Sequence, residues 1–253
     1  MTDVPLLRLG VTGTDTGIGK TIVTAALAAR ARELGLRVAA MKPIESGVES
    51  RFSSSTAYNS DADRLQAATG GTDSLEMIRP YNLVEPLAPL IAAQRAGVTI
   101  DVGVLDAAKD ALSLDRDLLL VEGAGGLLVP ITRDVTFLDL FARWRCELVL
   151  VAGNRLGVLN HTLLTTRAAE SVGLPLRAII LTSYSNNERN IAEATNYDAL
   201  RMLLPDQAIY RFPWVDRSDD FSALAAAAAG CGLDALLRDE TPAATSPGTL
   251  FLD

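Results

Sequence analysis

A candidate phosphate-binding loop lies close to the N-terminus. Residues 13–21 read Gly-Thr-Asp-Thr-Gly-Ile-Gly-Lys-Thr, between an apolar run over residues 6–11 and a helical pattern over residues 22–34. Strand, glycine-rich loop and helix in this order form a P-loop, whose backbone N–H groups bind phosphate oxygens at the positive end of the helix dipole. Lys20 would then reach the β- and γ-phosphates, and the Thr21 hydroxyl would bind Mg²⁺. The motif predicts a nucleoside triphosphate site.

The loop departs from the usual spacing. Five residues separate Gly13 from Gly19, and Thr14 stands where the first glycine is expected, because the general motif has four intervening residues. The alternative is an ordinary glycine-rich turn between a strand and a helix. The coincidence of strand, Gly-Lys-Thr and helix favours the phosphate-binding interpretation.

Three further polar segments follow predicted buried strands. Residues 42–47 follow an expected strand at 37–41, residues 122–126 follow one at 117–121, and residues 182–187 follow one at 177–181. Parallel strands present their carboxyl ends at one edge of a sheet, where open α/β sheets bind ligands. The P-loop and the first two segments together carry an amide cradle, lysines and a carboxylate, which are the parts that phosphoryl transfer needs.

The same segments supply oxygen ligands for a metal ion. Mg²⁺ takes few protein ligands and keeps several waters, so Thr21, Glu122 and one of Asp61 or Asp63 would suffice. Ser60 is the expected N-cap of a helix that begins at this point. An acidic residue there could instead complement the helix dipole. Spacing alone leaves both interpretations of Asp61 open.

Strands and helices alternate along the whole chain. This pattern predicts an α/β fold of the P-loop NTPase type, with a mostly parallel central sheet covered by helices on both faces. We expect one domain over residues 1–240, a loose tail over 241–253 and an active-site loop over 48–60. The remaining expected elements are an irregular segment at 80–89, helices at 90–96, 101–112, 157–172, 188–203 and 222–237, and strands at 147–152 and 208–212.

Composition excludes several classes of protein. The net charge of −8 argues against non-specific nucleic-acid binding and against a basic membrane-binding surface. No apolar run is long enough to span a membrane and no signal-peptide pattern is present, so a cytoplasmic location is expected. Cys146 and Cys231 lack metal-ligand spacing and are expected to be buried thiols. The single histidine, His161, excludes a multi-histidine metal site and is expected to be structural.

Seven segments follow one another in order over most of the chain and carry a resemblance to a known family: residues 13–21, 42–47, 59–62, 85–89, 122–126, 156–161 and 213–214. With these segments the chain resembles the dethiobiotin synthetase family, which closes the ureido ring in biotin synthesis with ATP. The long P-loop spacing is this family's own form.

The resemblance implies a reaction and its participants. CO₂ forms a carbamate on one amine of 7,8-diaminononanoate, ATP phosphorylates the carbamate, and the second amine closes the ring, releasing ADP and phosphate. Mg²⁺ is the implied metal. The implied assembly is a homodimer with each substrate at the subunit interface, and neither nucleic acid nor a membrane is a partner.

The resemblance also implies roles for individual residues. The catalytic residues would be Lys42, Lys20 and Thr16, and the metal ligands Thr21, Asp61 and Glu122. The substrate would contact Thr16, Lys42, Ser46, Gly157, Val158 and Asn160. ATP would be bound by Asp15, Thr16, Gly17, Ile18, Gly19, Lys20, Thr21, Glu122, Thr182, Ser183 and Pro213. Known members read adenine with an asparagine, where this chain has Thr182 and Ser183.

Two alternative functions fit the P-loop. One is another ATP-dependent amide or carbamate ligase on the same scaffold. The other is a partitioning-type switch ATPase, which acts by dimerising. Such switches often carry a second lysine early in the loop, and this loop has none before Lys20. Fold analogy cannot separate these functions, so the site must.

Overall fold

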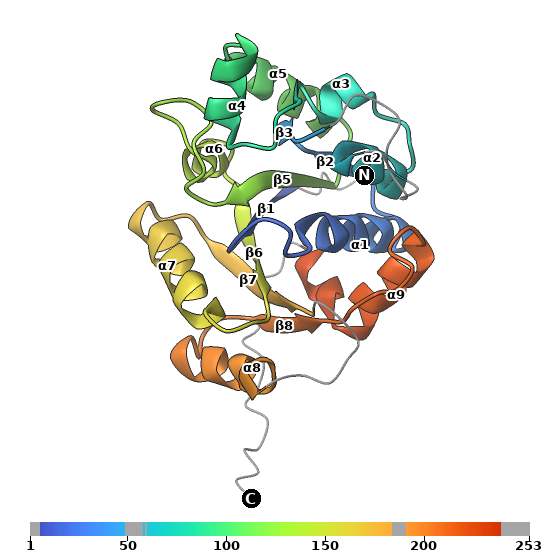
Figure 1. The fold of residues 1–253 in the computed structure, drawn as a ribbon. Coiled ribbons are helices and arrows are strands. Elements are labelled where there is room, and N and C mark those ends of the chain that lie inside the picture. Colours follow the sequence, from blue (N-terminus) through green and yellow to red (C-terminus); the bar gives the residue numbers. More distant parts are fainter. Residues whose placement is uncertain (1–5, 49–57, 59, 184–190, 239–253) are drawn as a thin grey trace, which may run out of the picture.

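The computed structural model describes residues 6–48, 58, 60–183 and 191–238. The central feature is a six-stranded parallel sheet in the order β2-β5-β1-β6-β7-β8 (Figure 1). The predicted α/β fold with a mostly parallel sheet is confirmed. The strands are β1 (Leu7–Gly13), β2 (Val38–Met41), β5 (Leu118–Gly126), β6 (Glu147–Gly153), β7 (Leu176–Thr182) and β8 (Ile209–Phe212).

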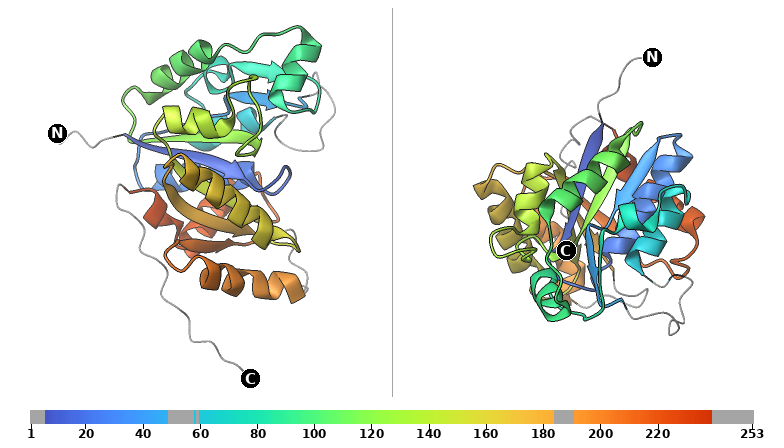
Figure 2. Two further views of the ribbon diagram at one scale, coloured as in Figure 1. Left: turned by 90° about the vertical axis from the view of Figure 1, so that its left-hand side faces the viewer. Right: turned by 90° about the horizontal axis from the view of Figure 1, so that it is seen from above.

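Helices cover both faces of the sheet, which explains why the strands are apolar throughout. Along β5, Leu118 and Leu120 pack into the cluster on one face while Leu119 and Val121 pack into the cluster on the other. The first face carries α1 (Lys20–Glu33), α9 (Phe221–Gly230) and the 3₁₀ helix η1 (Leu233–Leu236). The second carries α5 (Val102–Ser113), α6 (Phe137–Arg143), α7 (Val158–Ser171) and α8 (Ile191–Leu203), and Figure 2 shows α6, α7 and α8 across it.

A small subdomain is built beside the β2 edge. β3 (Ile44–Ser46) pairs in parallel with β4 (Tyr81–Leu83), and α4 (Pro89–Ala96) packs against both strands. α2 (Asp61–Thr69) packs against α1 and β2, and α3 (Leu75–Ile78) packs against α2, α5 and β2. The expectation of irregular chain at 80–89 is wrong for β4. Three residues between prolines carry too weak a pattern to be recognised, and pairing with β3 makes the strand.

Other boundaries differ from the expected ones for local reasons. The closing helix expected at 222–237 divides into α9 and η1, because Gly232 between them adopts a left-handed φ of +78°. The short helix α6 was not expected. β5 continues to Gly126 instead of ending at residue 121. None of the described helices is long and apolar enough to cross a membrane.

The cysteines differ in environment. Cys146 is buried, and burial raises the pKa of its thiol to about 12. Cys231 is only partly buried, so the expectation of a buried thiol is correct for Cys146 and wrong for Cys231. The expected tail at 241–253 and most of the expected loop at 48–60 fall outside the described residues.

Candidate nucleotide and catalytic site

The P-loop lies at the carboxyl end of the central strand β1. Gly17 and Gly19 adopt left-handed φ values of +68° and +93°, and Gly19 directly precedes α1. A Cβ atom at Gly13 would lie 2.9 Å from Lys20 Nζ and 2.9 Å from the Asp15 carbonyl oxygen, so only glycine fits there. Lys20 Nζ donates to that carbonyl at 2.7 Å. The glycines therefore allow the loop to wrap closely around the lysine.

Two contacts hold the loop against β7 and against the segment that follows β6. Thr182, at the end of β7, donates from Oγ1 to the Ile18 carbonyl at 2.6 Å. Asp15 pairs with Arg155 at 2.6 Å. The Thr16 N–H, which donates to Asp15 at 2.7 Å, and the Arg155 guanidinium hold the pKa of the Asp15 carboxyl below its usual range.

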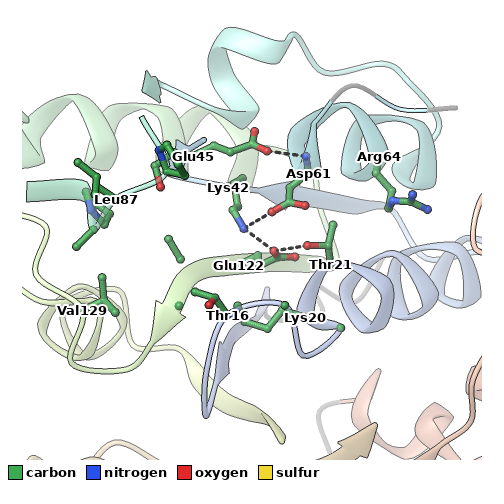
Figure 3. A pocket seen from close by; sticks show the side chains of 18 of the residues that line it. Thr16, Lys20, Thr21, Lys42, Glu45, Asp61, Arg64, Leu87, Glu122 and Val129 are labelled. Atoms are coloured by element: carbon green, nitrogen blue, oxygen red, sulfur yellow. Dashed lines mark hydrogen bonds and ion pairs between the residues drawn. The ribbon is translucent and has the colours of Figure 1, made fainter. Parts of the chain in front are cut away.

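A cluster of charges, buried except for Asp61, faces the loop (Figure 3). Lys42 follows β2, and its Nζ contacts Glu122 Oε1 on β5 at 2.6 Å and Asp61 Oδ2 on α2 at 2.7 Å. Thr21 also donates to Glu122 Oε1, at 2.8 Å. Lys42 is 4% exposed and Glu122 is 0% exposed. Four elements thus bring together the residues that the sequence predicts as a site.

The environments of the lysines set their pKa values in opposite directions. Burial lowers the pKa of Lys20 to about 8. Burial also acts to lower the pKa of Lys42, but Glu122 and Asp61 outweigh it and the net shift is upward. Burial acts to raise the pKa of Asp61, and Lys42 outweighs it, so the net shift is downward. Lys42 and Asp61 are therefore an ion pair at neutral pH.

The oxygen atoms of this cluster fit a magnesium ion. Glu122 Oε2 is buried without a hydrogen-bond partner, while Oε1 accepts from two donors. Within the described part of the chain, no group of three or more His, Cys, Asp and Glu side chains could hold a metal. The carboxylates of Asp61 and Glu122 and the Thr21 hydroxyl provide the few oxygen ligands with which Mg²⁺ is usually bound. Asp61 lines the cavity described below and Asp63 does not.

Glu45, in β3, holds the start of α2 in place. Its Oε1 accepts the Asp61 N–H at 2.6 Å, and its Oε2 accepts from Arg79 at 2.8 Å. Ser60 accepts the Asp63 N–H at 3.1 Å and is the N-cap, as predicted. The sequence assigned no role to Glu45. In the sequence, Glu45 is recognisable only as a carboxylate three residues after Lys42. The residues that it binds, Asp61 and Arg79, lie much further along the chain.

Two adjoining cavities share the walls formed by Gly17, Gly19 and Ile22. The larger, about 670 Å³, contains Lys20, Lys42 and both carboxylates of the cluster. Its apolar wall consists of Pro86, Leu87, Ala88, Pro89, Ala124 and Val129. The smaller, about 240 Å³, is lined by Ile18, Thr182, Ser183, Pro213 and Trp214, among others. The pair fits a nucleotide with its phosphates in the first cavity and its base in the second.

The structure brings together most of the predicted site residues. The larger cavity is also lined by Thr16, Thr21 and Ser46, whereas Asp15 lies beside it. Gly157, Val158 and Asn160 line neither cavity and lie at the start of α7. Val158 is buried, while Gly157 and Asn160 are exposed.

Comparison with known proteins shows which family this chain resembles. A family described as "AAA domain" matches residues 8–219. A protein of Anaeromyxobacter sp. (strain Fw109-5), named ATP-dependent dethiobiotin synthetase BioD, is 42% identical over 77% of this chain and 88% of its own length. A protein of Salmonella typhi, named ATP-dependent dethiobiotin synthetase BioD 1, is 36% identical over 85% of this chain and 93% of its own length.

A solved structure supports the fold independently. The septum site-determining protein MinD from Pyrococcus horikoshii OT3, solved with Mg-ADP, aligns over 93% of this chain and 100% of its own with a TM-score of 0.52. At 16% identity this likeness concerns the fold alone. The relatives at 36–42% identity cover most of both chains. The chain belongs to the family of ATP-dependent dethiobiotin synthetases.

Proposed function

We propose that this chain is a cyclo-ligase that converts 7,8-diaminononanoate, CO₂ and ATP into dethiobiotin, ADP and phosphate. One amine attacks CO₂ to give a carbamate. A carbamate oxygen then attacks the γ-phosphorus and ADP leaves. Finally the second amine attacks the carbamoyl carbon, phosphate leaves and the ureido ring closes.

The observation that carries this proposal is the placing of Lys42. Its ammonium lies in the phosphate cavity, and the same cavity has an apolar wall from Pro86 to Pro89 with Val129. A carbamate needs a cation beside the γ-phosphate, and the hydrocarbon chain of the diamine needs an apolar surface. One cavity offers both.

Each polar residue has a defined task in this proposal. Lys20 and the N–H groups of the P-loop bind the phosphates, and Lys42 holds the carbamate beside them. Two anions must approach each other for the phosphoryl transfer, so fixed cations lower the barrier by positioning and by electrostatic stabilisation. Thr16 and Ser46 line the cavity where they can contact the carbamate and the amines.

Mg²⁺ would be held by Thr21, Asp61 and Glu122 and would neutralise charge on the nucleotide phosphates. Ser183, Pro213 and the backbone around Ile18 would surround the base. In a homodimer, the N-terminus of α7 in one subunit would bind the carboxylate of the substrate that lies in the cavity of the other subunit, since helix N-termini bind anions. The exposed Gly157 and Asn160 support this assignment.

The test is to measure phosphate release and dethiobiotin formation together. The complete mixture contains ATP, Mg²⁺, bicarbonate and 7,8-diaminononanoate, and each component is omitted in turn. We expect phosphate and dethiobiotin in equal amounts, and neither product when the diamine is absent. Phosphate release that does not depend on the diamine would instead indicate a switch ATPase. Dependence on another amine or carboxylate would indicate a different ligase.

A further inference from the structure

Arg64 contacts the walls of both cavities. It lies on α2, three residues after Asp61, and lines the larger cavity. Its Nη1 donates to the Ser218 carbonyl, and Ser218 lines the smaller cavity. Figure 3 shows Arg64 pointing away from the cluster of Lys42, Asp61 and Glu122. None of the roles assigned so far uses this side chain.

A second contact strengthens the link. The guanidinium carbon of Arg64 lies 5.0 Å from the centre of the Tyr58 ring. That ring in turn packs against Phe221, the first residue of α9, with 5.6 Å between ring centres. The segment 213–220, which contains Pro213 and Trp214 of the smaller cavity, is therefore held at Ser218 and at its junction with α9.

We propose that Arg64 is a nucleotide-positioning residue, which holds segment 213–220 against α2 and so fixes the base cavity relative to the P-loop. The helix that carries Asp61 and the wall around the base then move as one body. This inference rests on the nucleotide-binding half of the proposed function and does not depend on the diamine.

An arginine beside a phosphate cavity could also contact a phosphate directly. The contacts favour positioning, because the guanidinium is engaged by a backbone carbonyl of the base cavity and by an aromatic ring. The two roles predict different results for a ligand without a base. A positioning residue affects ATP binding and leaves inorganic tripolyphosphate unaffected, whereas a phosphate-binding residue affects both.

The experiment measures dissociation constants for ATP and for tripolyphosphate by calorimetry, with Mg²⁺ and without diamine. For Arg64→Ala we expect the Kd of ATP to rise about tenfold, equivalent to about 1.4 kcal/mol, and that of tripolyphosphate to stay within about twofold. Arg64→Lys keeps a hydrogen-bond donor but loses the planar guanidinium that faces the Tyr58 ring, so we expect the Kd of ATP to rise about threefold. In turnover, the KM for ATP should rise while kcat stays within about twofold.

Arg217→Ala is the matched control, because Arg217 lies in the same segment but pairs with Asp220. Its Kd for ATP should stay within about twofold of the parent value. If Arg64→Ala does not fold, Tyr58→Leu tests the same link, with an expected rise of about threefold for ATP alone.

An unchanged Kd of ATP in Arg64→Ala would overturn the proposal. So would equal weakening of ATP and tripolyphosphate, or an equal effect of Arg217→Ala. Because binding is measured without diamine, a failure to form dethiobiotin would refute the proposed function and leave this result intact.

Discussion

Lys20 and Lys42 are both buried, but their partners differ. Lys20 contacts a backbone carbonyl of its own loop, and its pKa is lowered because burial disfavours the charge. Lys42 lies between two carboxylates, which raise its pKa. A bound phosphate would therefore supply the counter-charge that Lys20 lacks. We infer that Lys20 serves nucleotide binding and Lys42 serves the later chemistry.

Replacing each lysine separates these tasks. Lys20→Ala should abolish turnover and weaken ATP binding by at least about tenfold, because it removes charge from the phosphate site. Lys42→Ala should bind Mg-ATP within about threefold of the parent and form almost no dethiobiotin. Calorimetry and a product assay on both variants check this.

Stability provides the control for that comparison. Lys42→Ala leaves the buried carboxylate of Glu122 without its partner, which costs about 3–5 kcal/mol. Thermal unfolding should therefore be measured first, and Lys42→Gln serves as the milder variant. Equal loss of ATP affinity at the two positions would contradict the division of tasks.

The base cavity predicts loose discrimination among nucleotides. Thr182 Oγ1 is already engaged with the Ile18 carbonyl. No amide side chain lines this cavity among the described residues, while Asn186 and Asn187 lie outside them. An amide carries its donors and its acceptor on two separate atoms, so it can bind both a donor and an acceptor on the edge of a base. A hydroxyl has one donor and its acceptor sites on a single atom and matches a base edge less completely. GTP and CTP should therefore support turnover with a kcat/KM within about tenfold of ATP.

The measurement compares kcat/KM for ATP, GTP and CTP in the parent and in Asn186→Ala and Asn187→Ala. If either asparagine reads the base, the parent prefers ATP and the variant loses that preference. A strong ATP preference that survives both substitutions would refute loose base discrimination and also base recognition by Asn186 or Asn187. It would indicate that backbone groups recognise the base.

The sequence allowed prediction of those site residues that directly follow a buried strand, because the end of the strand determines where they lie in the fold. Lys42 and Glu122 directly follow predicted buried strands, so a parallel sheet had to place them near the P-loop. Arg64 and Glu45 could not be predicted. Their partners, Ser218 and Arg79, lie far away in sequence, and neither residue type signals such a contact.

Among the elements that form the site, α2 is held in position by a residue outside the helix. It begins with Asp61, and Glu45 binds the N–H of that residue and of Ala62, at 2.6 and 3.4 Å. The long strands were predictable from their apolar runs. β3 and β4 were not, since three residues carry no periodicity and only the packing around them makes them strands.

Glu45→Ala should displace the start of α2 and with it Asp61. We expect the Mg²⁺ concentration for half-maximal activity to rise about tenfold, because removing a residue that orients a metal ligand typically costs about 10- to 100-fold in metal affinity. The melting temperature should also fall, because Arg79 loses its buried partner. Glu76→Ala on α3, where the carboxylate is exposed and lies outside the cavity, is the matched control. An unchanged Mg²⁺ requirement in a folded Glu45→Ala would show that Asp61 does not depend on Glu45.

At the scale of the whole molecule, the start of α7 stands apart from both cavities. Leu156 is 86% exposed and Leu164 is 62% exposed, on either side of the exposed Gly157 and Asn160. The mostly parallel sheet with helices on both faces was predictable from the alternating strands and helices. How two chains would share a site was not, because a sequence does not show which faces meet.

A shared site predicts that two inactive variants restore each other. Lys42→Ala removes the catalytic lysine from one side of a site, and Gly157→Phe blocks the α7 side. Each homodimer should therefore be inactive. Exchange of subunits gives heterodimers with one intact site, and an equal mixture should regain about a quarter of the parent activity. Gly173→Ala controls for strain, because Gly173 also has a positive φ, +67°, but lies just beyond the other end of α7. Sedimentation shows whether dimers form. A fully active monomer, or a mixture that stays inactive although heterodimers form, would contradict the shared site.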